Sequence, residues 1–187
     1  MRRWLGPADA VLQQVAWWVA ILAAARGAGG IAALAGSAVV AVHLAARAPE
    51  RARVARTAIA AALYGFGADT LLAWKGLVSF AGGGTLSPAW MVALWAAFGV
   101  ALTASLRASL RWRPIELAAA AAVVGPLAYE AGAGLGALSI ADGARPILAL
   151  VAAWVVGVLV IAIVARDDGV APGSIETSAQ GERRWAR

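Results

Sequence analysis

Six long apolar segments, separated by short stretches that carry most of the charged residues, dominate the chain. A hydrocarbon core of about 30 Å requires roughly 20 apolar residues of α-helix at about 1.5 Å per residue. The segments that meet this requirement are residues 9–25, 28–46, 57–74, 89–106, 114–134 and 146–165. The pattern predicts an all-α membrane protein, a six-transmembrane-helix bundle formed by residues 1–166. Residues 167–187 are polar, and we expect them to form a disordered cytoplasmic tail.

The cations predict the orientation of this bundle, because short loops on the cytoplasmic side of a membrane collect lysine and arginine. With the N-terminus inside, 13 of the 16 cations fall in inside segments and 3 in outside segments. The inside set is Arg2, Arg3, Arg47, Arg51, Arg53, Arg56, Arg107, Arg111, Arg113, Arg166, Arg183, Arg184 and Arg187; the outside set is Arg26, Lys75 and Arg145. The split alternates at every loop, and it therefore predicts an N-in, C-in protein.

The N-terminal segment also has features of a secretory signal peptide. Arg2 and Arg3 precede an apolar run that ends in three alanines. Asp9, Gln13 and Gln14 interrupt the approach to that run, and the next span follows after only a few residues. We therefore favour a retained first span in a helical hairpin over a cleaved signal.

Composition narrows the function classes. Apolar residues make up 62% of the chain and charged residues 14%, whereas soluble domains have about 45–50% and about 25%. A soluble enzyme, a nucleic-acid-binding domain and a disordered protein are poor fits, and the net charge of +6 reflects orientation. The lipid bilayer is the expected partner, with no nucleic acid. The chain has no cysteine and one histidine, so neither a metal nor another cofactor is expected.

Tryptophans at the ends of spans indicate where the membrane interfaces lie, because this side chain is enriched at headgroup depth. Trp74 and Trp90 flank the loop of residues 75–88, so we expect both in the outer aromatic belt. Trp112 is expected in the inner belt, and the loop itself in the outer interface.

Short segments in five of the spans carry a family resemblance. They are Gln14-Val-Ala-Trp17, Val42-His43-Leu44, Gly67-Ala-Asp69-Thr70, Pro88-Ala-Trp90-Met-Val-Ala-Leu-Trp95, Gly125-Pro126-Leu-Ala-Tyr129 and Ala131-Gly132. In this order and spacing, the chain over residues 9–165 resembles the bacterial membrane-protein family catalogued as domain of unknown function 2878. Glu130 departs from the family pattern. The resemblance implies a small multi-pass protein of the bacterial inner (cytoplasmic) membrane, and it implies no reaction.

Asp69 is the charged residue most clearly inside a span, where a carboxylate costs at least about 2.5–3.5 kcal/mol on insertion scales. Ala58, Ala62 and Gly65 precede it on the same helix face, so this smooth face should pack against another helix and hide the carboxylate from lipid. Asp69, with Thr70 beside it, is then a proton or cation site. The alternative is an interhelical hydrogen bond that fixes packing.

Glu130 lies one helical turn after Pro126 in the fifth span. A proline inside a helix removes one backbone hydrogen bond, so Gly125 and Pro126 predict a helix break. Glu130 then lines an outward-facing polar pocket with Asp69 or Tyr129. In the alternative, Glu130 reaches the interface or pairs with Lys75 or Arg145.

Polar residues at the cytoplasmic ends of three spans form a second candidate cluster. They are Gln13, Gln14, His43, Thr103 and Arg107, of which the last two share a helix face. Together they are expected to line a cytoplasmic vestibule in which His43 shuttles protons. Alternatively, His43 makes an ordinary hydrogen bond at the interface and Arg107 extends to lipid phosphates.

Three function classes remain open. A small transporter or transport accessory with a proton or small-molecule ligand is motivated by Asp69 and Glu130. A non-catalytic assembly partner would form homo- or hetero-oligomers through alanine- and glycine-rich helix faces. An accessory or enzyme of lipid or envelope modification is motivated by Gln14, His43 and Arg107. No catalytic motif is found, so the sequence favours a protein that is not an enzyme.

Overall fold

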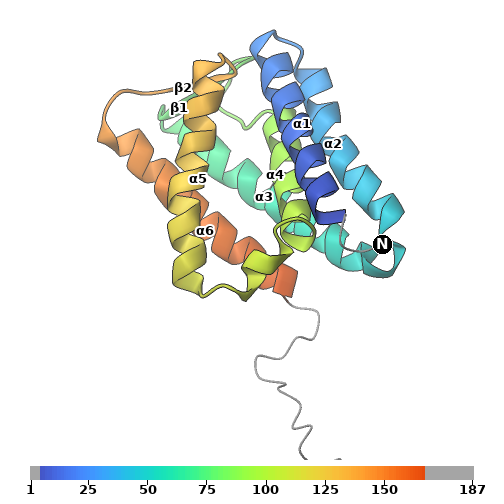
Figure 1. Cartoon of the computed structure of the whole chain (residues 1–187). Coiled ribbons are helices and arrows are strands. Elements are labelled where there is room, and N and C mark those ends of the chain that lie inside the picture. The colour runs from blue at the N-terminus through green and yellow to red at the C-terminus, as the bar shows by residue number, and fades with distance from the viewer. Residues whose placement is uncertain (1–4, 167–187) are drawn as a thin grey trace, which may run out of the picture.

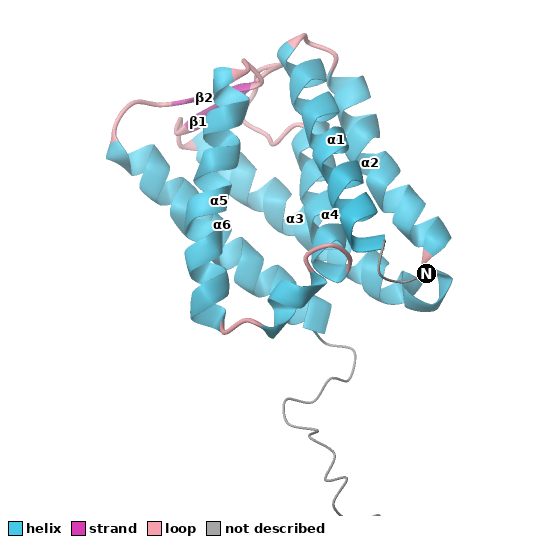
Figure 2. Cartoon of the chain, viewed as in Figure 1, coloured by secondary structure: helices cyan, strands magenta, loops and turns pink. Residues whose placement is uncertain are grey.

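A computed structural model describes residues 5–166, and within them six helices run alternately up and down in a bundle (Figures 1 and 2). The α-helices are α1 (Leu5–Ala25), α2 (Gly29–Ala46), α3 (Arg51–Trp74), α4 (Ala89–Thr103), α5 (Pro114–Gly134) and α6 (Ala144–Arg166). Two short 3₁₀ helices, η2 (Ala48–Glu50) and η3 (Arg107–Arg111), and two strands, β1 (Val78–Phe80) and β2 (Leu138–Ile140), complete the described part. The predicted tail, residues 167–187, lies outside it.

The two ends of the bundle differ in charge. The helices α1, α3 and α5 begin at the end that we call the arginine-rich end, and α2, α4 and α6 finish there. Its described cations are Arg47, Arg51, Arg53, Arg56, Arg107, Arg111, Arg113 and Arg166. The opposite end, which we call the strand end, carries Arg26, Lys75 and Arg145. Within residues 5–166, the bundle thus separates the cations into the two groups that the sequence predicts.

Five of the described helices are long and apolar enough to cross a membrane, which is compatible with a multi-pass membrane protein. The exception is α4, whose 15 residues reach about 22 Å. It ends at Thr103 and not at residue 106, because Ala104 leaves helical geometry at φ −125° and ψ −103°. The Asp9 carboxylate then accepts a hydrogen bond from the Ser105 backbone N–H at 2.8 Å, which fixes this terminus against α1.

The short helix α4 is the centre of the bundle. Ten of its residues are buried, and it packs against α1, α2, α3 and α6. Glycines permit the closest of these contacts: a Cβ on Gly36 would lie 2.7 Å from the Ala93 carbonyl carbon, and one on Gly99 would lie 2.7 Å from the Thr57 carbonyl oxygen. Small residues let helix backbones approach in this way.

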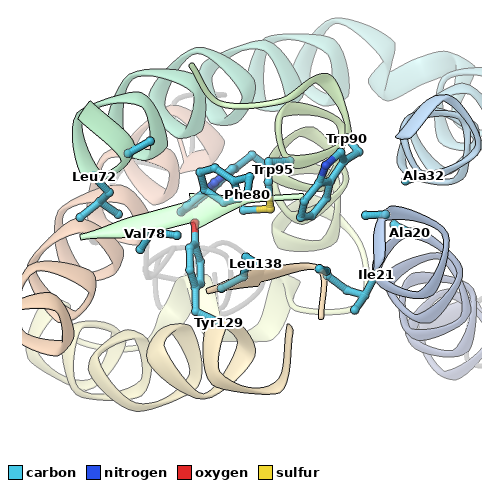
Figure 3. Packing of buried hydrophobic residues seen from close by; sticks show 14 of the residues in the cluster. Ala20, Ile21, Ala32, Leu72, Val78, Phe80, Trp90, Trp95, Tyr129 and Leu138 are labelled. Carbon is cyan, nitrogen blue, oxygen red and sulfur yellow. The ribbon is translucent and has the colours of Figure 1, made fainter. Parts of the chain in front are cut away.

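The strands correct the all-helical prediction at one end. β1 and β2 pair in antiparallel fashion, with Val78 opposite Ile140 and Phe80 opposite Leu138. Phe80 packs edge-on against Trp90 at 6.0 Å between ring centroids, inside the cluster that Figure 3 shows. Trp90 is therefore a core residue with 2% exposure, and the prediction that it joins the outer aromatic belt is wrong.

The outer faces of the helices expose many large apolar side chains. Examples are Val11, Leu34, Leu63, Leu148 and Ile163, all of which are more than half exposed. Such a surface is unfavourable in water but suits contact with hydrocarbon.

Candidate functional site

Asp69 lies at the junction of three helices and is completely buried, with 0% exposure. Its Oδ1 accepts a hydrogen bond from the Tyr129 hydroxyl of α5. Its Oδ2 accepts one from Trp95 Nε1 of α4 at 3.0 Å and a longer one from the Ser87 hydroxyl at 3.5 Å. Figure 3 shows the Tyr129 oxygen turned into the bundle toward Trp95. Asp69 therefore joins α3, α4, α5 and the segment before α4.

Thr70 supports the same junction from the next position of α3. Its Oγ1 accepts a hydrogen bond from the Ser87 backbone N–H at 3.0 Å. The segment between β1 and α4 is thereby held over Asp69 by Ser87. The predicted grouping of Asp69, Thr70 and Tyr129 is present.

Aromatic rings enclose the junction. The Trp95 ring lies directly on Gly65, where a Cβ would come within 2.0 Å of Trp95 Cγ. Trp154 lies 4.7 Å from Trp95 between ring centroids, and Tyr64 lies 5.7 Å from it. The Trp95 ring therefore packs on the smooth helix face that the sequence predicts from Gly65 and its alanine neighbours. Donors thus meet both carboxylate oxygens of Asp69.

Glu130 does not belong to this junction. Its side chain is exposed, and among the described residues no hydrogen bond or ion pair joins it to Asp69, Tyr129, Lys75 or Arg145. The reason is helical geometry: Tyr129 faces the interior, and the next residue of a helix points about 100° away. Within residues 5–166, Glu130 therefore does not form the predicted polar pocket with Asp69 or Tyr129.

Gly125 and Pro126 do not break α5, which runs without interruption from Pro114 to Gly134. Both residues are buried, and a Cβ on Gly125 would lie 2.0 Å from Trp154 Cγ. Gly125 thus makes room for the Trp154 ring, as Gly65 does for Trp95. The predicted break is wrong, because the glycine serves close packing between α5 and α6.

The second polar cluster is built around Asp9 and His43 at the arginine-rich end. His43 Nε2 lies 2.7 Å from Asp9 Oδ1, and both side chains are nearly buried. His43 Nδ1 lies 2.8 Å from the carbonyl oxygen of Val39. The remaining carboxylate oxygen accepts the Ser105 N–H described above. The pair therefore links α1, α2 and the end of α4.

His43 connects Asp9 to the backbone of α2. A carbonyl oxygen only accepts, so Nδ1 of His43 carries a hydrogen and donates it to Val39. Nε2 faces Asp9 Oδ1 at 2.7 Å, a close contact that lacks the alignment of a hydrogen bond. The pair therefore places one acidic group and one basic group side by side at this end of the bundle.

Arginines surround Glu50 beside this pair. Arg47 donates to Glu50 Oε2 at 3.0 Å and to the Thr103 carbonyl oxygen at 2.8 Å. Arg53 donates to the same Oε2, and an Arg107 nitrogen lies 3.8 Å from Oε1. Three guanidinium groups thus share one carboxylate, which leaves an excess of positive charge here.

A cavity of about 680 Å³ opens among these groups. Its charged and titratable lining residues are Asp9, His43, Arg47, Glu50 and Arg107. Two of the three arginines that share Glu50, Arg47 and Arg107, are in this lining. The cavity is therefore suited to a small anion.

The predicted cytoplasmic cluster is only partly assembled. His43 and Arg107 line the cavity, whereas Gln13 donates to the Ala97 carbonyl oxygen at 3.1 Å and Thr103 donates to Val100 in its own helix. Gln14 lies on a neighbouring groove.

Sequence reasoning missed Asp9, Arg47 and Glu50 as partners in this cluster. One signal was available: Asp9 and His43 lie nearly the same number of residues from the turn at Gly27, so an antiparallel hairpin places them at one level. Among residues 5–166, no group of three or more histidine, aspartate or glutamate side chains is placed to hold a metal ion.

Comparison with known proteins places the chain in a family. A family model described as "Protein of unknown function (DUF2878)" matches residues 7–160. Neither the curated proteins nor the solved structures give a match.

Proposed function

The chain belongs to this DUF2878 family of proteins of unknown function, and we propose that it is a small membrane transporter for an anionic solute. The observation that carries the proposal is the close contact of Asp9 and His43 at a cavity with excess positive charge. Ionisable groups inside a membrane protein commonly mark ion pathways and proton relays. This assigns the proton site to Asp9–His43, and it leaves Asp69 as a packing centre.

The proposal includes a six-span topology with both termini in the cytoplasm of a bacterium, in its inner membrane. The segregation of the cations to the arginine-rich end supports this orientation. In this arrangement α4 is the short central span, completed by the segment that leads into η3. The Asp9–His43 cavity then opens toward the cytoplasm.

Single-cysteine labelling tests the topology, because the chain contains no cysteine of its own. Thr85 is exposed at the strand end, and Ala108 is exposed in η3 at the arginine-rich end. In intact cells, an impermeant maleimide is expected to label Thr85→Cys and to label Ala108→Cys only after the membrane is permeabilised. Labelling in the reverse pattern would contradict the orientation.

The charge balance of the cavity indicates proton-coupled transport. A bound anion is attracted by Arg47 and Arg107, but carrying it across the bilayer alone would move a net charge through low dielectric. In the proposed cycle, the Asp9–His43 pair takes up one proton with each bound anion. One anion and one added proton then cancel, so the loaded cavity has the same charge as the empty one.

Proton flux into proteoliposomes tests this function. Vesicles that contain a trapped pH-sensitive dye receive an inward gradient of phosphate, acetate, lactate or succinate. We expect at least one anion to drive protons inward faster than it does in protein-free vesicles. His43→Gln should reduce this protein-dependent flux by about 100-fold, the low end of what a positioned proton-transfer group contributes.

Glu130→Gln is the matched control, because it neutralises an exposed carboxylate outside the cavity. It should keep the flux of the unmodified protein. Proton movement no faster than in protein-free vesicles with all four anions, or full flux in His43→Gln, would refute the proposal.

A further inference from the structure

A second hollow, of about 550 Å³, lies between α1 and α5 with α4 as its floor. We call it the lateral groove. Nearly all of its lining is apolar; it includes Trp17, Leu94, Phe98, Val124, Leu127 and Ala128. Gln13, Gln14 and Ser105 supply polar groups, and all three lie toward the arginine-rich end.

The groove exists because α1 and α5 meet at only one end. At the strand end, a Cβ on Gly132 of α5 would lie 3.7 Å from Ile21 Cδ1 of α1. From there the two helices diverge toward the arginine-rich end, as Figure 1 shows. Between the groove and the Asp9–His43 cavity, α1 is held to α4 by the Gln13 hydrogen bond to Ala97 and to the residue Ser105 after α4 by Asp9.

The groove is open on the side that would face lipid. Val124 and Leu127 on α5 are 59% and 61% exposed, whereas Trp95 and Tyr129, deep in the groove, are each 3% exposed. Asp69 holds both of these rings by hydrogen bonds. A preformed, mostly apolar hollow with polar groups at one end is typical of a ligand site, and its volume lies within the usual range of about 300–1,000 Å³.

We propose that the lateral groove binds one acyl chain of an anionic phospholipid, with the phosphate at the arginine-rich end. A transmembrane helix is too large: ten residues of a cylinder about 10 Å wide occupy about 1,200 Å³, twice the volume of the groove. Charge complementarity selects the headgroup, because Leu106 at the polar end of the groove leads directly into η3. The exposed cations there that lie outside the Asp9–His43 cavity are Arg111 and Arg113. This inference is independent of the transport proposal.

Photo-cross-linking in nanodiscs tests the inference. The probe is a phosphatidylglycerol with a diazirine near the end of one acyl chain, in a background of phosphatidylcholine, and labelled residues are mapped by mass spectrometry. The full chain is expected to carry its label on the facing sides of α1, α4 and α5. Ala128→Phe, which fills the groove, should lose most of this label, whereas Ala119→Phe, on an exposed position of the same helix, should retain it.

The map of the unmodified protein is decisive even if Ala128→Phe fails to fold. Label spread evenly over exposed faces such as those of Leu34 and Leu63 would overturn the proposal. An unlabelled groove in a protein that cross-links to a second copy would overturn it in favour of a protein contact. Equal labelling by a phosphatidylcholine probe of the same chain length would overturn the proposed selectivity for an anionic headgroup.

Discussion

Replacing Asp69 with alanine is expected to lower the free energy of unfolding by about 3 kcal/mol or more, the largest effect that we predict for one polar side chain. The substitution leaves the Tyr129 hydroxyl and Trp95 Nε1 buried without an acceptor, and each such group costs about 1–3 kcal/mol. It also removes the side chain that links α3 to α4 and α5. Denaturation in mixed detergent micelles measures the change.

A graded series distinguishes loss of hydrogen bonds from loss of volume. Asp69→Asn keeps an oxygen that accepts one donor, so it should cost less than Asp69→Ala. Tyr129→Phe removes one hydrogen bond and should cost about 1 kcal/mol. Glu130→Ala is the control and should stay within about 0.5 kcal/mol, because that side chain is exposed. Equal stability of Asp69→Ala and the unmodified protein would contradict the structural role of the junction.

Two glycines of α3 should respond to alanine in opposite directions. The Gly65→Ala methyl would lie 2.0 Å from Trp95 Cγ, and the ring cannot retreat without losing its hydrogen bond to Asp69. Overpacking of this kind costs about 1–3 kcal/mol, and we expect the upper end. Around Gly67 no atom lies within 4 Å of an added Cβ, so Gly67→Ala should gain about 0.5–1 kcal/mol from helix propensity.

The same denaturation experiment compares the two glycine variants. The sign of the difference matters more than its size, because both changes add one methyl group to the same helix. If Gly65→Ala were as stable as Gly67→Ala, the Trp95 ring of α4 would not pack against Gly65 of α3.

The lengths of the helices were predictable because uninterrupted apolar runs have few alternatives in a bilayer. The fifth predicted segment, 114–134, coincides with α5, and the second differs from α2 by one residue. The third began too late, at residue 57, because α3 starts at Arg51 and its first turns are charged. A hydropathy pattern finds the apolar span and not the whole helix.

The side of each helix that faces the interior was harder to predict. Asp69 was placed correctly, because small residues four, seven and eleven positions before it define one face. Around Glu130 apolar residues lie on all sides of the helix, so the pattern does not separate it from Tyr129. Periodicity assigns a face only where polar and apolar residues divide around the helix.

The Asp9–His43 pair shows a second limit. Each residue lies near the end of its span, where a polar side chain is unremarkable, and the contact depends on how α2 is rotated against α1 and α4. Gly36 sets that packing by its close approach to Ala93. Such contacts between helices leave no local pattern in the sequence, so the site became visible only in three dimensions.

The measurement that tests the central claim most directly is a double-mutant cycle on anion-driven proton flux. Proteoliposomes of the unmodified protein, Asp9→Asn, His43→Gln and the double variant are compared with phosphate, acetate, lactate and succinate supplied together. Because the proposal makes the two side chains a single proton site, each single variant should lose about 100-fold and the double variant should lose no more. Full flux in either single variant, or losses that multiply in the double variant, would contradict a shared proton site.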